Sequence, residues 1–477
     1  MEENVSSAED LSEGLKASEK KQFDKMTTTP IAKLIIGLGI PTTLNMMVTS
    51  LYNLADTLFV SGLGDAATGA VGVVMSLMSI IQAIGFTFGM GAGAVISKQL
   101  GERRQKDADV TASSSFVVSL IVGTLITVFG IIFLRPLMQA LGAATESTGA
   151  ATLQFAAEYA FYILLSAPFM CASFVLNNIL RSQGKAWLSM IGLVTGAVVN
   201  LALDPLLIYG CAMGIQGAAI ATMTSQVLGF VILLVMFLSG KSIARIRLKC
   251  VSFRPNVHFA VVSTGFPSFC RQMLASVCTI LLNYAVRDYA GGQAAMAVVS
   301  KVFMLAFSIA LGIGQGYQPA LGYNYAAKRY DRVKKAYLFT LFFSMALMAG
   351  FAVVCAILSP WIMEMFLENE QGKEIGLMTL RLQCISMPLL PVNFMAAVTY
   401  QVVGNKISAT ALSLSRQGLF YVPIILLMPL AFGVFGIESA QLFSDIGAFL
   451  FALPFTFFFF AKLKKLMIAT DETVKTE

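Results

Sequence analysis

Histidine is almost missing from this sequence, because His258 is the only one among 477 residues. A metal site built from histidines, or a catalytic triad with histidine as the base, therefore has no support. The seven cysteines include no CxxC spacing, so no disulfide framework is indicated. No Walker motif occurs, so ATP does not drive this chain directly. Together these absences indicate that the protein is not an enzyme.

Charged residues are also few. They make up 12% of the chain, whereas about a quarter is usual in a soluble domain, and hydrophobic residues make up 57%. Apolar stretches long enough to cross a hydrocarbon core, which takes roughly 20 helical residues, recur along nearly the whole length. Twelve such stretches predict an all-α polytopic membrane protein with twelve transmembrane helices.

The lysines and arginines are distributed unevenly between the loops. They gather in the N-terminal tail, in alternate loops and after the last apolar stretch, while the intervening loops carry very few. By the positive-inside rule, both termini and the basic loops are cytoplasmic, in a multi-pass protein of the cell membrane. The net charge of +7 is therefore a signature of topology, and no basic patch interleaved with aromatic residues indicates nucleic acid binding.

The two halves of the chain resemble each other weakly. The Gly-Ile-Pro of 39–41 aligns with the Gly-Phe-Pro of 265–267, and further matches keep the same order through most of each half. Six spans in each half make the repeat parallel, with a cleft expected between the halves. The predicted domains are a disordered cytoplasmic tail (1–30), an N-lobe of six helices (31–240), a cytoplasmic linker (241–257), a C-lobe of six helices (258–465) and a cytoplasmic C-terminal tail (466–477).

An aspartate interrupts the first apolar stretch. Buried carboxylates are costly in hydrocarbon and usually mark a path for ions or substrates. Asn45, Thr49, Tyr52 and Asp56 recur at helical spacing, so they form one polar stripe, with Asn53 at its flank. This stripe predicts a functional face on the first helix.

A second aspartate lies in the fifth apolar stretch. Asn200 and Asp204 are four residues apart on one helix face, and Pro205 frees the carbonyl oxygen of Leu201. A carboxyl group removed from water can hold a proton near neutral pH, and two of them with amide and carbonyl oxygens can instead hold Na⁺. The alternative is that the aspartates only satisfy polar neighbours and fix helix packing.

We favour cation coupling over this structural alternative. The residues assigned to cation coupling are Asp56, Asp204, Asn200, Tyr52 and Asn53, with Asp56 and Asp204 as a candidate Na⁺ site. The residues expected to line a substrate cavity are Asn45, Thr49, Asn177, Thr222, Gln226 and Met46. No other cofactor is expected.

The second half carries basic and amide groups at membrane depth. These residues are Arg271, Gln272, Asn283, Lys301, Arg416 and Asp445. Basic residues at this depth need counter-charges, and Asp445 is the evident partner. We interpret the set as a structural ion-pair network rather than a substrate site, and leave open which pairs form.

Several segments resemble motifs of the multidrug and toxic compound extrusion (MATE) family. They are YNLADTLFVSGLG, NLALDPLLIYG, GIQGAAIATMTSQ and QPALGYNYAAK, while GFPSFCRQ and SLSRQGLF resemble its bacterial MepA-like branch. The resemblance implies a V-shaped cavity and export of cationic or amphipathic xenobiotics, antibiotics included, by antiport with H⁺ or Na⁺. It also places Asp56, Asn200 and Asp204 on the family's coupling residues of the N-lobe. Ala275 stands where sodium-coupled NorM-type members have a glutamate, which favours coupling in the N-lobe.

Two functions from other classes are alternatives to export. A flippase for lipid-linked oligosaccharide or lipid II would need a cationic cavity, for which Arg271, Lys301 and Arg416 are candidates. A channel would need a filter-like loop, which the sequence lacks. We expect the protein to be a monomer. Its expected partners are the lipid bilayer and small molecules.

Overall fold

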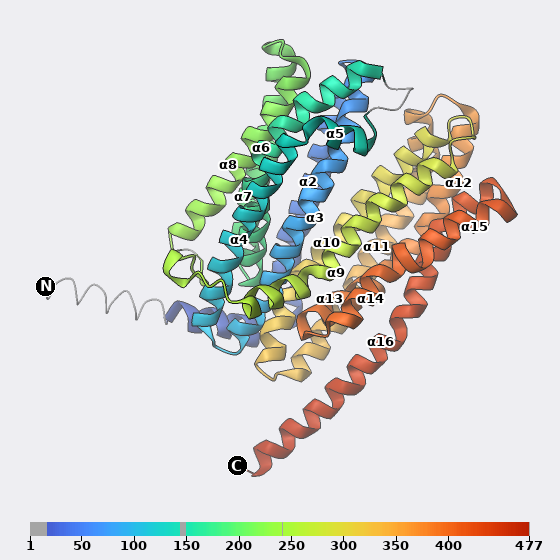
Figure 1. The fold of residues 1–477 in the computed structure, drawn as a ribbon. Helices are drawn as coiled ribbons and strands as arrows, with labels where there is room; N and C mark the ends of the chain where they lie inside the picture. Colours follow the sequence, from blue (N-terminus) through green and yellow to red (C-terminus); the bar gives the residue numbers. More distant parts are fainter. Residues whose placement is uncertain (1–16, 144–148, 241, 477) are drawn as a thin grey trace, which may run out of the picture.

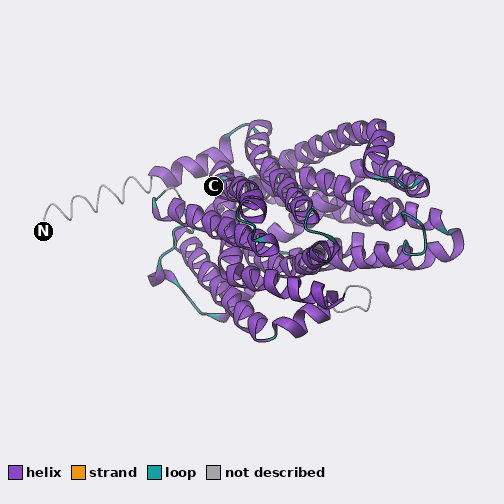
Figure 2. Ribbon diagram, turned by 90° about the horizontal axis from the view of Figure 1, so that it is seen from above, coloured by secondary structure: helices purple, strands orange, loops and turns teal. Residues whose placement is uncertain are grey.

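The computed structural model describes residues 17–143, 149–240 and 242–476. These residues form helices joined by loops, with no strand among them (Figure 2). Within this part of the chain, twelve helices are long and apolar enough to cross a membrane. The predicted all-α class and the count of twelve spans are therefore confirmed.

Each half of the chain supplies six spans. Those of the N-lobe are α2 (Ile31–Ser61), α3 (Asp65–Gly101), α4 (Gln105–Ile132), α6 (Gly149–Ser182), α7 (Ala186–Pro205, extended by the π-helical turn Leu206–Gly210) and α8 (Gly214–Leu238). A short helix, α5 (Leu134–Met138), follows α4. Those of the C-lobe are α9 (Pro255–Ala285), α10 (Gly292–Ala326), α11 (Tyr330–Phe366), α12 with α13 (Glu370–Ser386 and Leu390–Val403), α14 with α15 (Lys406–Leu414 and Val422–Phe432, joined by the π-helical turn Ser415–Tyr421) and α16 (Val434–Thr476).

Local sequence signals set several of these helix boundaries. Asn369 precedes α12, and its side chain accepts a hydrogen bond from the backbone N–H of Gly372 (3.0 Å). Asn405 caps α14 in the same way. Gly404 ends α13 with a φ of 93°, a conformation that residues with a Cβ rarely adopt. The tight corner between α13 and α14 therefore follows from a Gly-Asn pair.

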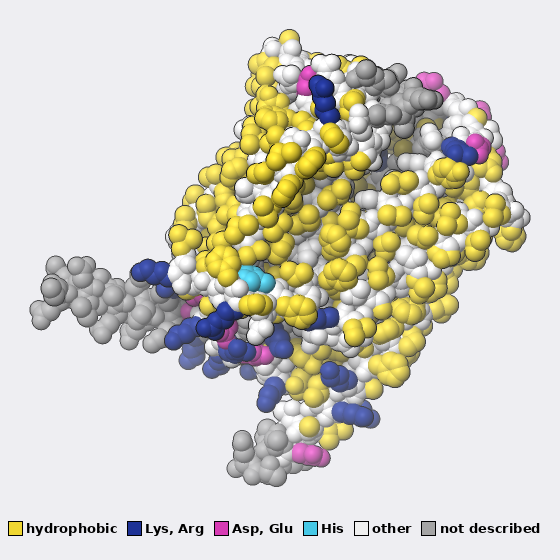
Figure 3. All heavy atoms as spheres, in the orientation of Figure 1, with side chains coloured by type: hydrophobic (Ala, Val, Ile, Leu, Met, Phe, Trp, Pro, Cys, Tyr) yellow, Lys and Arg dark blue, Asp and Glu magenta, His cyan; other side chains and the backbone are white. Residues whose placement is uncertain are grey.

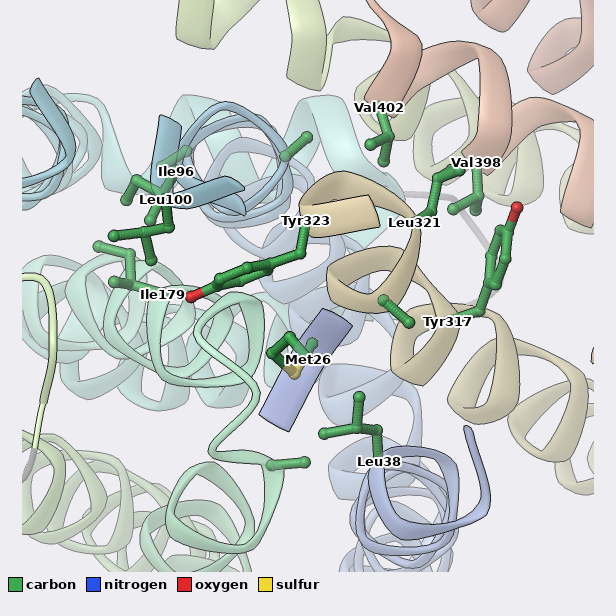
Figure 4. Close-up of a cluster of buried hydrophobic side chains, with 14 of the residues drawn as sticks. Met26, Leu38, Ile96, Leu100, Ile179, Tyr317, Leu321, Tyr323, Val398 and Val402 are labelled. Carbon is green, nitrogen blue, oxygen red and sulfur yellow. The ribbon is translucent and has the colours of Figure 1, made fainter. Parts of the chain in front are cut away.

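The two lobes meet at one end of the molecule and diverge at the other, which gives a V shape (Figure 1). One buried hydrophobic cluster draws on both lobes near the end where both termini lie. In Figure 4, Leu100 and Ile179 of the N-lobe lie near the ring of Tyr323 of the C-lobe within this cluster. Two further clusters each belong to a single lobe. Among the described residues, the lobes thus share a core at the closed end of the V and nowhere else.

Glycines allow α2 of the N-lobe and α10 of the C-lobe to touch backbone to backbone at this end. A Cβ added to Gly316 would lie only 2.6 Å from the Cα of Gly39. Helices in membranes often pack by such close approach. No hydrophobic force drives them together there, and small residues let the backbones come close enough for van der Waals contact. The seam between the lobes therefore depends on residues without a side chain.

Gly316→Ala is expected to destabilise the protein, because the added methyl group forces α2 and α10 apart. Overpacking of this kind typically costs about 1–3 kcal/mol. Gly350→Ala on α11 is the matched control, because its Cβ would meet no atom within 4 Å. The measurement is the melting temperature of each purified variant in detergent. Equal melting temperatures for Gly316→Ala and Gly350→Ala would contradict the packing described for the seam.

The predicted disordered tail, 1–30, is wrong for its second half. Residues 17–28 are helical, and Met26 is fully buried in the shared core (Figure 4). Gln22 donates to the carbonyl of Gln183 in the N-lobe (2.7 Å), while Asn324 of the C-lobe donates to the carbonyl of Met26 (3.0 Å). These tertiary contacts stabilise the helix. The local sequence is polar and does not indicate a helix by itself, so it could not be predicted. Residues 1–16 lie outside the described part.

The linker is also held by contacts with the rest of the chain, and the C-terminal tail is helical. The linker lies along α4, where the N–H of Arg245 donates to Asp109 (2.8 Å) and that of Arg247 donates to Ser113 (3.0 Å). The tail continues α16 as far as Thr476. On the face drawn in Figure 3, basic side chains gather at the end where these segments lie, and the middle is mostly hydrophobic. This is the surface expected of a multi-pass membrane protein.

Candidate functional site

A cavity of about 450 Å³ lies between the lobes. The N-lobe contributes α2, α3, α6, α7 and α8 to its wall, and the C-lobe contributes α9, α10, α12, α16 and the π-helical turn at Ser415–Tyr421. Much of the wall is aromatic or methionine, as at Phe86, Phe174, Phe303 and Met304. Cavities of this size and character are typical of small-molecule sites, and methionine adapts its shape to different ligands.

The structure divides the residues predicted to line the cavity. Those on the wall are Met46, Thr49, Thr222 and Gln226. Asn177 does not line it, because its amide donates to the carbonyl of Ser189 (2.8 Å) and ties α6 to α7. Asn45 is buried on α2, one turn nearer the closed end than Thr49. The helical pattern predicts the face of a helix but not the depth at which the cavity ends.

Asp56 and Asp204, from α2 and α7, lie together in the N-lobe. Their carboxyl groups are close enough to interact directly, and the two residues are only 7% and 0% exposed. The amide of Asn200 donates to Asp204 Oδ1 (3.2 Å) and reaches Thr222 Oγ1 (3.5 Å). Neither aspartate lines the cavity, but their neighbours Tyr52 and Asn200 do. The pair therefore lies directly behind the cavity wall.

The local backbone sets the position of Asp204. Pro205 follows it and is succeeded by the π-helical turn Leu206–Gly210. Such turns interrupt the regular hydrogen-bond ladder and often occur at functional sites. The carboxyl group thus lies at a discontinuity of the fifth span.

Two adjacent carboxyl groups out of water cannot both be ionised without a compensating cation. One oxygen each of Asp56, Asp204 and Asn200 is buried without a hydrogen-bond partner. The described residues contain no cluster of three acidic, histidine or cysteine side chains. A metal ion at this pair would therefore also need neutral oxygens, such as those of Asn200 and Thr222. The pair can hold a shared proton or a small cation.

Tyr159 of α6 belongs to this site and was missed by the sequence analysis. Its hydroxyl lies 3.3 Å from Thr222 Oγ1 and close enough to Asp56 for the two groups to interact electrostatically. Nothing in the sequence distinguishes it from the other tyrosines, because its partners come from α2 and α8. The side chain of Asn53, which was assigned to the same site, lies outside the described ones.

Tyr159→Phe is expected to slow transport several-fold while leaving the protein folded. The change removes the hydroxyl beside the carboxylate pair together with its hydrogen bond to Thr222, a contribution of about 0.5–1.5 kcal/mol. Tyr162→Phe on the same helix is the matched control, because no hydrogen bond of the Tyr162 hydroxyl is found among the described residues. Dye efflux from proteoliposomes measures both, and equal rates would show that Tyr159 only fills space.

The C-lobe contains a separate polar cluster around Asp445. Arg416 Nε lies 2.7 Å from Asp445 Oδ1, and Gln441 donates to the same oxygen (2.7 Å). Ser386 donates to Asp445 Oδ2 (2.6 Å). Every partner comes from a different segment of the lobe except Gln441, so the cluster ties α12, the π-helical turn and α16 together. Of the predicted pairs, the structure brings together Arg416 and Asp445.

Other residues assigned to this network lie elsewhere. Arg271 and Gln272 line the cavity on α9, and the Arg271 guanidinium lies 5.4 Å from the ring centroid of Phe394. The prediction that Lys301 and Asn283 belong to this network is wrong. Both side chains are exposed, and no contact of either with Asp445 is found among the described residues. Helical spacing alone could not separate the inner face of these spans from the outer one.

The chain matches known proteins over most of its length. Residues 41–206 and 267–427 match the family model described as MatE. The multidrug export protein MepA of Staphylococcus saprophyticus is 24% identical over 417 residues, which cover 87% of this chain and 91% of MepA. A solved structure described as the outward-facing conformation of a multidrug resistance MATE family transporter is 25% identical, with a TM-score of 0.87 over 92% of this chain and 98% of its own.

A second solved structure is that of a MOP superfamily transporter from Pyrococcus furiosus. It is described as having a binding pocket of reverse polarity that suggests a different function. It is 25% identical, with a TM-score of 0.85 over 93% of this chain and 98% of its own. These matches confirm the resemblance found in the sequence motifs. Because the MatE matches cover more than half of the chain, the protein belongs to the MATE family of multidrug efflux transporters.

Proposed function

We propose that the protein exports cationic or amphipathic small molecules across the cell membrane by antiport with H⁺ or Na⁺. The observation that carries the proposal is the buried Asp56–Asp204 pair directly behind the wall of a cavity between two lobes. An ion held by this pair and a cation held in the cavity compete for the same negative charge. Binding of each therefore weakens binding of the other, which is the reciprocal coupling that exchange requires.

The conformational step is a rocking of one lobe against the other, as in other transporters built from repeats. The lobes share a core only at the end that carries the basic residues, so separating them there would open the cavity to that side. By the positive-inside rule we assign that end, with both termini, to the cytoplasm. The structure then corresponds to the state in which the cytoplasmic side is closed. We assign a monomer as the transporting unit.

The flippase alternative rested on three basic residues in a cationic cavity. Only Arg271 and Arg416 of these lie on the cavity wall, and Arg416 is already paired with Asp445. Lys301 is exposed elsewhere on α10. One unpaired arginine is a weak site for a pyrophosphate, which carries several negative charges. The antiport proposal is therefore preferred.

Ethidium efflux from proteoliposomes of the purified protein tests the proposed function. Efflux should require a lower pH, or a higher Na⁺ concentration, on the side to which the dye is delivered, because the ion moves against the dye. Applying the two gradients separately identifies the ion. Efflux that is equal with and without either gradient would contradict antiport.

A further inference from the structure

The charges on the cavity wall have the opposite sign to those behind it. Among the described residues that line the cavity, the charged ones are Arg271 and Arg416, and none is acidic. The carboxylates of Asp56, Asp204 and Asp445 all lie behind the wall. A molecule in the cavity therefore meets guanidinium groups directly on the C-lobe side and carboxylates only indirectly.

The two arginines differ in what satisfies them. Arg416 forms its ion pair with Asp445 and lies over the ring of Phe303, 5.0 Å from its centroid. Arg271 has no carboxylate within ion-pair distance and no hydrogen-bond acceptor for its guanidinium among the described residues. Its guanidinium lies over the face of the Phe394 ring. Arg271 thus presents unused N–H donors in a cavity that is largely apolar.

An unpaired charge in such surroundings is unfavourable, and a ligand that supplies an anion would relieve it. The guanidinium is a planar fork whose parallel N–H groups match the two oxygens of a carboxylate. A small cavity of about 30 Å³ adjoins the guanidinium and is also lined by Arg416, Asn393 and Gln417. A space of this volume holds about one or two water-sized groups, so it can admit part of a carboxylate beside the guanidinium.

We infer that Arg271 binds a carboxylate of the transported molecule, so that the preferred substrates are zwitterionic amphiphiles. The apolar body of such a molecule occupies the aromatic and methionine-rich cavity. Its carboxylate lies against Arg271, and its cationic group faces the N-lobe wall in front of Asp56 and Asp204. This inference rests on the proposed export function and adds a substrate class to it. It makes Arg271 a specificity-determining residue.

The inference is tested with two dyes that differ only at the carboxylate. Rhodamine B is a zwitterion with a free carboxylate, and rhodamine B methyl ester is the corresponding cation. Fluorescence polarisation measures the affinity of both for the full-length protein in detergent micelles. Arg271→Gln is expected to weaken rhodamine B binding about ten-fold or more, because a charge-assisted bidentate contact is lost, and to leave the ester within about two-fold.

Two further variants separate recognition from damage to the fold. Arg271→Lys keeps the charge but loses the fork, so it should bind rhodamine B with an affinity between those of wild type and Arg271→Gln. Arg287→Gln changes an exposed arginine outside the cavity and should leave the affinity for both dyes unchanged. An equal loss of both dyes in Arg271→Gln, or no loss of either, would overturn the inference.

Efflux of the same dyes from proteoliposomes distinguishes failure of this site from failure of the export function. One outcome is that wild type exports neither dye while Arg271→Gln still weakens the binding of rhodamine B and not that of its ester. In that case the export function is overturned and the carboxylate site stands. If wild type exports both and Arg271→Gln slows both equally, the site is overturned and export stands. Selective loss of rhodamine B export supports both.

Discussion

Asp204→Asn is expected to lower gradient-driven ethidium efflux at least ten-fold. Asparagine keeps the size of the side chain and its hydrogen bond to Asn200, but it cannot bind or release a proton and has no charge for Na⁺. Asp56→Asn should have the same effect, because the two carboxyl groups act as one site. Coupling free energies in proteins typically correspond to factors of about 5 to 150, which sets the size of the loss.

The measurement is the initial rate of efflux from proteoliposomes under the gradient that drives wild type. Asp288→Asn is the control, because this carboxylate is exposed on the loop after α9. Melting temperatures should show that each variant is folded. If either pair variant retains the full gradient-driven rate, the carboxylate pair is not the coupling site, and its role is limited to helix packing.

Asp445→Ala is expected to destabilise the C-lobe by about 3–5 kcal/mol, because it leaves the Arg416 guanidinium buried without its partner. The side chain of Arg416 is 12% exposed and that of Asp445 is 0% exposed, so water can replace only part of the lost contact. The double variant Asp445→Leu with Arg416→Met should recover most of the loss, because no charge then remains buried.

Denaturant unfolding of the purified protein in detergent measures these differences. Asp331→Ala, which removes an exposed ion pair with Lys335, should cause no measurable change. A double variant that is no more stable than Asp445→Ala would show that the ion pair is not the cause. The comparison separates the structural network of the C-lobe from the carboxylate pair of the N-lobe.

The coarse architecture could be predicted because it depends on quantities that are local in sequence. Hydropathy sets the number of spans, and the loop charges and the internal repeat set their grouping into two lobes. The two N-lobe aspartates could be singled out because a carboxylate in an apolar stretch is costly wherever it points. Asp445 could be named as the counter-charge of the C-lobe by the same argument, but the sequence did not show that Arg416 is its partner.

The remaining features depend on helix rotation and depth, which packing decides and the sequence does not state. Lys301 and Arg271 look alike in sequence, yet one is exposed and the other lines the cavity. Tyr159 reaches the carboxylate site only because α6 packs beside α7 and α8, which carry Asp204 and Thr222. The helix of residues 17–28 forms in contact with both lobes, and no local signal announces it.

The most direct test of the account is the affinity of purified wild-type protein for ethidium as a function of pH and of Na⁺ concentration. If the Asp56–Asp204 pair exchanges an ion against the drug, affinity must fall as pH falls or as Na⁺ rises. The same titration of the double variant Asp56→Asn with Asp204→Asn, which has no carboxyl group left to bind the ion, should be flat. An affinity for wild type that depends on neither pH nor Na⁺ would contradict the central claim.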